Sequence, residues 1–351
     1  MGTITKSIGS DGRDYSTITL WDAALGGAAG GSGNDAIGEV YNDSAFDESP
    51  TVADNTPDTI TLRAASGEEH DGTAGTGARI VRSTTASFLF KFDGTNIAAI
   101  ETLEFDANRK SNSTAVEIIT GSGNPSGARR LHRCLAHGLL TTSDTTTGVD
   151  CDGNTSVQNC LIYDIDNQAG GAAANIGLKL PTGSARDSQA FNCTVHNVNK
   201  NGTGSSTGIS VNDDASNTCQ NCIVTDTNNE GVGSAVDFSP ASPSNATMDH
   251  NLSSDNTASG TGSLTSKASA DQYVSNAEGS EDLHLASGAD AIDAGSDLGT
   301  SPASVEIDID GRDRDSEGDT WDIGADEYVA APPASKAHVL GGGVGGYIIG
   351  A

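Results

Sequence analysis

The sequence is short of basic and aromatic residues. Lys and Arg together number 18 in 351 residues, against 48 Asp and Glu, which gives a formal net charge of −30, and aromatic residues make up 4%. A field of this sign repels phosphate backbones and anionic lipids, so we expect neither a nucleic-acid partner nor attachment to a membrane. The scarcity of aromatic residues also argues against a large core flanked by helices.

Long apolar runs and a cysteine framework are missing as well. No stretch of about 18 apolar residues offers a membrane span, and residues 1–6 lack the basic and apolar regions of a secretory signal. The six cysteines are too few for a disulfide-stabilised fold in a chain of this length. We therefore expect a protein that is made in a host cytoplasm without a signal peptide.

The sequence does contain a repeat. Six short apolar segments share one central position and follow one another at intervals of about 30 residues. The central positions are Leu103, Cys134, Cys160, Cys193, Cys222 and Asn251. A second set of apolar segments, beginning at residues 115, 148, 177, 208 and 235, repeats with a similar period. Short strands separated by turns, with no helical pattern between them, predict a parallel β-helix.

The repeat also predicts which side chains face the core. The four cysteines at central positions should stack inward, one per turn, as small apolar residues, and Asn251 should continue their column as an amide. The next residue of each segment points outward. This places four aliphatic residues in an outer stripe that needs a cover, either a neighbouring subunit, which we prefer, or a loop or tail of the chain itself. The stripe consists of Leu135, Leu161, Ile223 and Leu252.

The first residues predict a cap. Ile18, Trp21 and Leu25 have helical spacing, Ser16 or Thr17 can cap the helix, and two glycines end it. Such a helix would cover the open end of the coil. We therefore divide the chain into a cap region over residues 1–36, a β-helix over 37–328, and a linker with a docking tail over 329–351.

Segments near the end carry a family resemblance. They are DLHL at 282–285, AIDAG at 291–295, DIDGRDR at 308–314 and DIGADEY at 322–328. They resemble the closing motifs of right-handed parallel β-helix repeat proteins, relatives by fold of the pectate lyases. The opening GRDYST at 12–17, with Trp21, resembles phage-encoded members. The resemblance implies an all-β, single-stranded right-handed parallel β-helix whose last turn these motifs close, and it implies no particular activity.

Candidate catalytic residues are weak, and we predict no catalytic set. Glu117, Asp150, Lys179 and Asp237 fall on one predicted outward column, but only the first two acids lie on neighbouring turns. His137 and His196 fall two turns apart, too far to share one metal ion.

One acidic stretch suits calcium, because closely spaced carboxylates are the ligands that this ion prefers. Its residues are Asp308, Asp310, Asp313 and Asp315. The alternative is a network of Asp and Arg residues that stabilises a turn. Of the two, we prefer the network, and we therefore expect no cofactor unless calcium binds here.

The last residues differ from the rest of the chain. Residues 336–351 carry one charged side chain, six glycines and six larger apolar residues: Val339, Leu340, Val344, Tyr347, Ile348 and Ile349. Either the segment is a disordered terminus, or it docks into a partner subunit by strand addition. An uncharged tail on so acidic a chain favours docking.

These features together predict a structural protein on the virion surface of a phage, either a capsid decoration or a spike. The tail would attach it to capsid or other virion subunits, and we expect a homo-oligomer, with a trimer as the first guess. The alternatives are a polysaccharide lyase or hydrolase, such as a tailspike depolymerase, and an adhesin that binds a host glycan.

Overall fold

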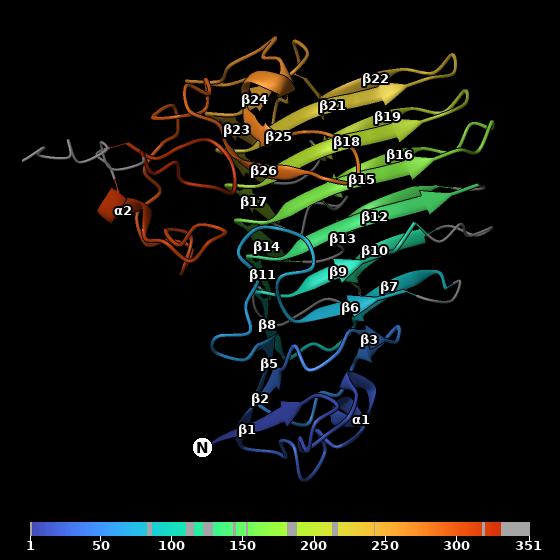
Figure 1. Cartoon of the computed structure of the whole chain (residues 1–351), viewed down its shortest axis with the longest axis vertical. Coiled ribbons are helices and arrows are strands. Elements are labelled where there is room, and N and C mark those ends of the chain that lie inside the picture. The colour runs from blue at the N-terminus through green and yellow to red at the C-terminus, as the bar shows by residue number, and fades with distance from the viewer. Residues whose placement is uncertain are drawn as a thin grey trace, which may run out of the picture.

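Each repeat of the sequence forms one turn of a right-handed parallel β-helix of about eight turns (Figure 1). The computed structural model describes residues 2–82, 86–109, 116–121, 129–142, 145–151, 154–180, 188–212, 217–241, 243–317 and 320–330. The predicted fold class is therefore confirmed. The six apolar tail residues from Val339 to Ile349 that we assigned to a partner interface lie outside the described residues.

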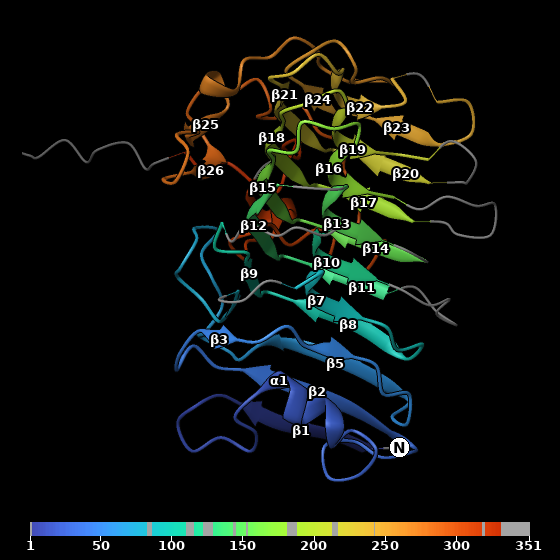
Figure 2. The same cartoon turned by 90° about the vertical axis from the view of Figure 1, so that its right-hand side faces the viewer.

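Three parallel sheets, A, B and C, form the walls of the coil, and from β2 onward the chain visits them in this order on each turn. Sheet A contains β1 (Gly2–Ile8), β2 (Asn34–Val40), β5 (Thr59–Ala64), β8 (Ile97–Glu101), β11 (Arg129–His132), β14 (Thr155–Gln158), β17 (Gln189–Phe191), β20 (Thr218–Gln220) and β23 (Thr247–Asp249). Sheet B contains β3 (Phe46–Asp47), β6 (Arg79–Val81), β9 (Glu104–Asp106), β12 (Leu135–Thr141), β15 (Leu161–Asn167), β18 (Thr194–Lys200), β21 (Ile223–Asn229) and β24 (Leu252–Ser253). Sheet C contains β4 (Thr51–Val52), β7 (Phe88–Phe92), β10 (Val116–Gly121), β13 (Thr146–Cys151), β16 (Asn175–Lys179), β19 (Ser206–Ser210) and β22 (Ala235–Ser239). Figure 2 shows the strands of sheet A stacked along the coil.

A column of left-handed residues turns the chain from sheet A into sheet B. Its φ angles lie between 46° and 57°, a conformation that Asn tolerates better than most residues. The column consists of Thr102, Arg133, Asn159, Asn192, Asn221 and His250. The central position of each repeat follows directly. Its four cysteines are buried and free, as predicted, and the backbone N–H of Cys134 points at the sulfur of Cys160, 3.4 Å away. Asn251 continues the stack by accepting a hydrogen bond from the N–H of Cys222.

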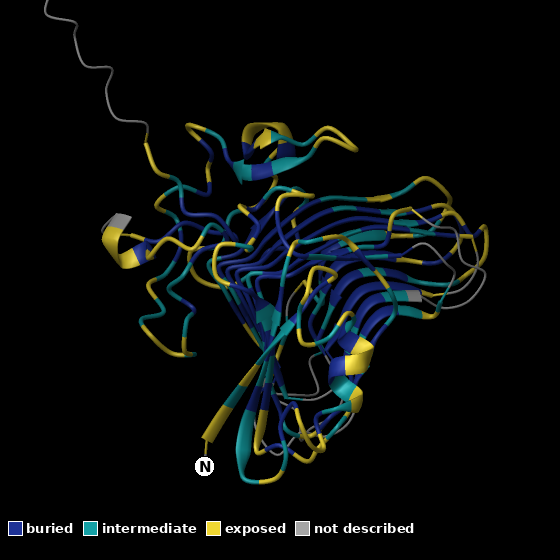
Figure 3. Cartoon of the chain, turned by 60° about the horizontal axis from the view of Figure 1, so that its bottom comes forward, coloured by how far each residue is buried: buried dark blue, intermediate teal, exposed yellow. Residues whose placement is uncertain are grey.

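The N-terminal end carries the predicted helix. α1 (Ile18–Ala23) is capped by the Thr17 side chain, and it buries Trp21 against the first turns while Leu20 on its other face is 52% exposed (Figure 3). The helix is shorter than the spacing predicted. The strand β1 lies inside the region that we treated only as a cap. It pairs in parallel with β2 along its whole length, so it forms part of sheet A.

From its motifs we expected the C-terminal segment to close the last turn of the coil. The structure shows that it does not. After β24 the chain forms η1 (Ser269–Asp271), the antiparallel pair β25 (Tyr273–Ser275) and β26 (Asp282–Leu285), and α2 (Arg314–Glu317). We call residues 264–328 the strap. It runs back along the coil and lies against the turns between sheets A and B (Figure 1, orange to red).

The left-handed column holds the strap. The side-chain amides of Asn159 and Asn192 both donate to the carbonyl of Val305, at 3.0 Å each, and that of Asn221 donates to the carbonyl of Ser296 at 2.8 Å. The guanidinium of Arg133 donates to the carbonyl of Ile309. These contacts join residues 75 to 176 positions apart, which is why a repeat of about 30 residues did not reveal them.

The strap also covers the predicted outer stripe. Leu135, Leu161, Ile223 and Leu252 are each 0–1% exposed. They form one apolar cluster with strap residues that include Tyr273, Leu283, Leu285, Ala291, Ile309 and Ile323. The prediction that these four residues form a partner interface was therefore wrong. The alternative prediction is correct, because the strap of the same chain covers them. Each buried aliphatic side chain stabilises this packing by about 1.5–3 kcal/mol.

Among the described residues, no helix has the length and apolar character that a membrane crossing requires.

Candidate functional site

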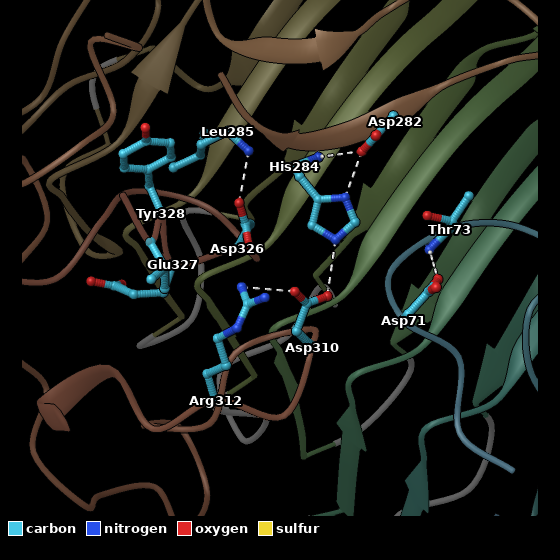
Figure 4. Close-up of a pocket in the computed structure, with 11 residues that line it drawn as sticks. Asp71, Thr73, Asp282, His284, Leu285, Asp310, Arg312, Asp326, Glu327 and Tyr328 are labelled. Atoms are coloured by element: carbon cyan, nitrogen blue, oxygen red, sulfur yellow. Dashed lines mark hydrogen bonds and ion pairs between the residues drawn. The ribbon is translucent and has the colours of Figure 1, made fainter. Parts of the chain in front are cut away.

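A cleft lies where the strap meets the loop of residues 66–77, which connects β5 to β6 (Figure 4). It has two neighbouring parts. The larger has a volume of ≈ 420 Å³ and is lined by residues of the loop and the strap, and we call it the His284 cleft. The smaller, ≈ 260 Å³, adds the outer face of sheet B, and we call it the Asp164 pocket. Residues 73 and 74 of the loop, and 281 and 282 of the strap, mark the boundary between them.

Three neighbouring strands of sheet B supply the floor of the Asp164 pocket. Asp106 ends β9, His137 lies in β12, and Tyr163 and Asp164 lie in β15. The side chains of His137 and Tyr163 stack with ring centroids 4.8 Å apart and planes inclined by 4°. His137 Nε2 is hydrogen-bonded to Glu104 Oε1 at 3.0 Å, so this ring has a fixed position.

Asp164 has an unusual environment for a carboxyl group. Its φ is +55°, in the left-handed region that a non-glycine residue adopts at some cost, and the residue is 5% exposed. Burial, together with the charge of Glu281, raises the pKa of Asp164 to about 6, even though Asn197 donates a 2.6 Å hydrogen bond to its Oδ1. A carboxyl group of this kind can both give and take a proton near neutral pH.

One cation lies beside this carboxyl group. Arg109 Nη2 lies 2.9 Å from Glu278 Oε1 and 3.6 Å from Asp166 Oδ2, and Arg109 Nη1 lies 3.9 Å from Asp164 Oδ2. The Arg109 side chain is partly exposed, so it can contact a bound molecule as well as the acids around it. The pocket therefore offers carboxyl, guanidinium and imidazole groups around a space open to solvent.

The His284 cleft gathers acids around one imidazole. His284 Nδ1 is 2.5 Å from Asp282 Oδ1, and His284 Nε2 is 2.9 Å from Asp310 Oδ1 (Figure 4). Burial opposes a charge on His284, but the hydrogen bond with Asp310, the charge of Asp326 and the hydrogen bond with Asp282 together raise its pKa to about 10. Arg312 pairs with the second oxygen of Asp310 at 2.8 Å.

The predicted calcium stretch does not form one site. Asp308 is buried and accepts hydrogen bonds from the N–H groups of Arg312 and Glu327, while Asp315 accepts one from the indole of Trp321. Asp313 caps the turn to Asp315. Of the four acids, only Asp310 lies in a group that could hold an ion, and its companions there are His284 and Asp326. The four acids therefore do not share one site, and calcium bound by Asp308, Asp313 or Asp315 stays a prediction.

The acidic column that we considered on sheet C is not a reactive cluster either. The register pairs Thr120, not Glu117, with Asp150, so these acids are not equivalent positions of neighbouring turns. Lys179 Nζ forms an ion pair with Asp150 Oδ2 at 2.6 Å, and Asp237 accepts hydrogen bonds from Ser254 and Asp255.

Sequence reasoning missed Asp164, Glu281, His284 and Asp326 as site residues. One signal for Asp164 was present, since polar residues recur three positions after the outward stripe, at Asn197 and Asp226. For His284 the signal was Asp282, which lies two residues earlier and so on the same face of a strand. Nothing in the sequence indicated that the strap would bring these residues to the loop of residues 66–77.

Comparisons with known proteins leave the site unassigned. No family model matches the chain, and no curated protein matches it. It is similar to two solved structures of the pectin methylesterase from Aspergillus niger, in penultimately deglycosylated and in deglycosylated form, with a TM-score of 0.35 for each. The identities are 14% and 13%, and the matches cover 74% of this chain and 84% and 85% of those chains. Likeness at this level carries no argument about the residues of the cleft.

Proposed function

We propose that this β-helix binds a glycan in the cleft and cleaves it at the Asp164 pocket. The observation that carries the proposal is the pKa of Asp164, which burial and Glu281 raise to about 6 in a pocket open to solvent. Perturbed carboxyl groups in clefts are enriched at catalytic sites. Glycoside hydrolysis needs two carboxyl groups with different roles, and Asp164 and Glu281 both line this pocket.

Each carboxyl group has a role that its environment suits. Asp164, whose pKa burial raises, protonates the oxygen of the leaving sugar. Glu281, at the rim between strap and loop, acts on the other side of the bond, either on a water molecule or directly on the sugar carbon. Arg109 lies close enough to Asp164 to hold a hydroxyl group of the sugar.

The charge of the site restricts the substrate. Asp106, Asp164 and Glu281 line the pocket with a single arginine, and the whole chain carries a net charge of −30. Polyuronates would be repelled unless cations screened them. We therefore propose a neutral or amino-sugar glycan as the substrate class.

The test is a cleavage assay on neutral, amino-sugar and acidic polysaccharides with release of reducing ends as the readout. We expect release from a neutral or amino-sugar polymer and at least a hundredfold loss of rate in Asp164→Asn, in keeping with the usual contribution of a general acid. Asp150→Asn is the matched control, because Asp150 is also a buried acid with one cationic partner but lies on sheet C. Equal rates in the two variants would contradict the proposal.

The tail supports a second, compatible function. Residues 331–351 carry one charged side chain and six larger apolar residues directly after the strap, and apolar side chains of this number favour burial against a partner. We propose on this basis that the protein is a surface component of a phage particle, a capsid decoration or a spike and a homo-oligomer, anchored through this tail. Attachment to purified particles should be lost when residues 331–351 are deleted, and attachment that survives the deletion would rule the tail out as the anchor.

A further inference from the structure

We propose that His284, Asp310 and Asp326 bind a divalent transition-metal ion. This ion would link three parts of the strap to one another beside the loop of residues 66–77. One nitrogen of His284 and one oxygen of each acid lie within 4.8 Å of one another. Three ligand atoms at this spacing can surround a single ion after small side-chain movements, since metal–ligand distances for these atoms are about 2.0–2.2 Å. The inference is independent of the proposed glycan cleavage.

The arrangement around His284 is typical of a metal ligand. Asp282 Oδ1 lies 2.5 Å from His284 Nδ1, so a ring proton stays on Nδ1 when an ion displaces the proton that Nε2 shares with Asp310. A carboxylate that orients a ligating histidine in this way recurs at protein metal sites and strengthens the ligand. The 2.9 Å hydrogen bond between Nε2 and Asp310 Oδ1 is the contact that an ion would replace.

Asp326 supplies an independent indication. The residue is 4% exposed, and its Oδ2 accepts a 2.7 Å hydrogen bond from the backbone N–H of Leu285. Its Oδ1 is buried without a hydrogen-bond partner among the described residues. A buried carboxylate oxygen without a donor is costly. An ion in the group would satisfy this oxygen.

The surrounding charge favours a cation, and the ligand atoms favour a particular class. Asp71, Asp282 and Glu327 add three carboxylates to the same cleft, while Arg312 is the one arginine among the described residues that line it. An imidazole with two carboxylates suits zinc, manganese or iron, whereas calcium prefers oxygen ligands alone. Because the cleft is open to solvent, water or a small molecule can complete the coordination, as the fourth ligand does at many zinc sites.

The place of the group in the chain indicates what the ion does. His284 lies in β26, Asp310 lies in the turn before α2, and Asp326 lies in the last described segment. The loop packs directly above them, since a Cβ atom at Gly72 would lie 2.5 Å from His284 Nε2. An ion here would join three parts of the strap and would stabilise the strap against the loop.

The experiment measures ion binding and thermal unfolding on the full chain, with no glycan present. Zn²⁺, Mn²⁺ and Ca²⁺ are titrated separately into chelator-treated protein. We expect saturable binding of one Zn²⁺ per chain, and a melting temperature raised by roughly 5 °C when free Zn²⁺ exceeds the Kd a hundredfold. Co²⁺ provides a spectroscopic readout, because its visible absorption bands report ligands bound to the ion.

Two variants locate the ion. Asp326→Asn keeps an oxygen that can accept the hydrogen bond from Leu285 and removes the charge, so we expect Zn²⁺ affinity to fall by about a hundredfold. Asp313→Asn is the control, because Asp313 belongs to the same acidic stretch but not to the group, and it should bind Zn²⁺ as the native chain does. Titration of the native chain decides whether an ion binds at all, and an absence of saturable Zn²⁺ or Mn²⁺ binding overturns the proposal. Unchanged affinity in Asp326→Asn, or binding of Ca²⁺ alone with loss in Asp313→Asn, also overturns it.

Discussion

Two columns of left-handed residues run along this coil, and they differ in what their side chains do. The first, at the turn from sheet A to sheet B, includes Asn159, Asn192 and Asn221, whose amides bind the strap. The second lies within sheet B at Gly138, Asp164, Asn197 and Asp226, with φ between 55° and 72°. In the first column, the neutral amides of the three asparagines donate hydrogen bonds to the strap. The second column contains a buried carboxyl group with a raised pKa. The same backbone conformation therefore serves stability in one column and a candidate reaction site in the other.

The largest expected effect is in the first column. Asn221 donates to Asn192 and to the carbonyl of Ser296, and it accepts from the N–H of Ser296. Asn221→Ala leaves these groups unsatisfied and places a Cβ residue without polar compensation in the left-handed region, so we expect a loss of about 4 kcal/mol in unfolding free energy. Asn221→Gly should lose about 1 kcal/mol less, because glycine adopts this conformation freely. Chemical denaturation measures both, and equal losses would show that backbone conformation contributes nothing.

The apolar cover of the strap should give the next largest effect. Ile223 is fully buried beneath it, so Ile223→Ala should destabilise the isolated protein by about 3 kcal/mol. Leu20→Ala, on the exposed face of α1, is the control and should change stability by less than about 0.5 kcal/mol. If Ile223→Ala affected only self-association and left the unfolding of the isolated chain unchanged, the stripe would be a subunit interface after all.

Substitution of Asp164 should stabilise the fold at neutral pH, whereas the substitutions at Asn221 and Ile223 destabilise it. Its pKa is about 6 in the folded chain and 3.8 without the fold, so the folded state holds the proton more tightly, and ionisation between these values destabilises the fold. Asp164→Asn should therefore match the native chain below pH 4 and become more stable as pH rises to 6, by about 2 kcal/mol at pH 7. Urea denaturation at pH 4 and pH 7 checks this. A variant that is less stable at pH 7 would place Asp164 with the structural residues of the first column.

The smallest effect concerns the tail. The strap contacts end at Tyr328, whose N–H donates to Asp322. Deleting residues 331–351 should therefore change the melting temperature by less than about 2 °C. A larger decrease in the isolated chain would mean that the tail contributes to the fold and does not serve only for attachment.

The sequence predicted the coil and not the strap, for a physical reason. Residues one turn apart must share a period, so the column from Cys134 to Cys222 was visible in the spacing. The contact of Arg133 with Ile309 spans 176 residues and has no period. The closing motifs identified the segment, but their roles became clear only in three dimensions, where Arg314 is fully buried and binds Glu327 and the side-chain oxygen of Asn159. The candidate site depends on the strap, so its residues could not be grouped from the sequence.

The central claim is that the Asp164 pocket, and not the strap-binding column, is where this protein acts on another molecule. The most direct test is a crystal structure of Asp164→Asn with an oligosaccharide of the neutral or amino-sugar class that we propose as the substrate. Our account predicts a glycosidic oxygen within hydrogen-bonding distance of residue 164, with Glu281 facing the same bond and Arg109 contacting a sugar hydroxyl group. A glycan bound on sheet C beside Asp150 and Lys179, with the Asp164 pocket free of sugar, would contradict it.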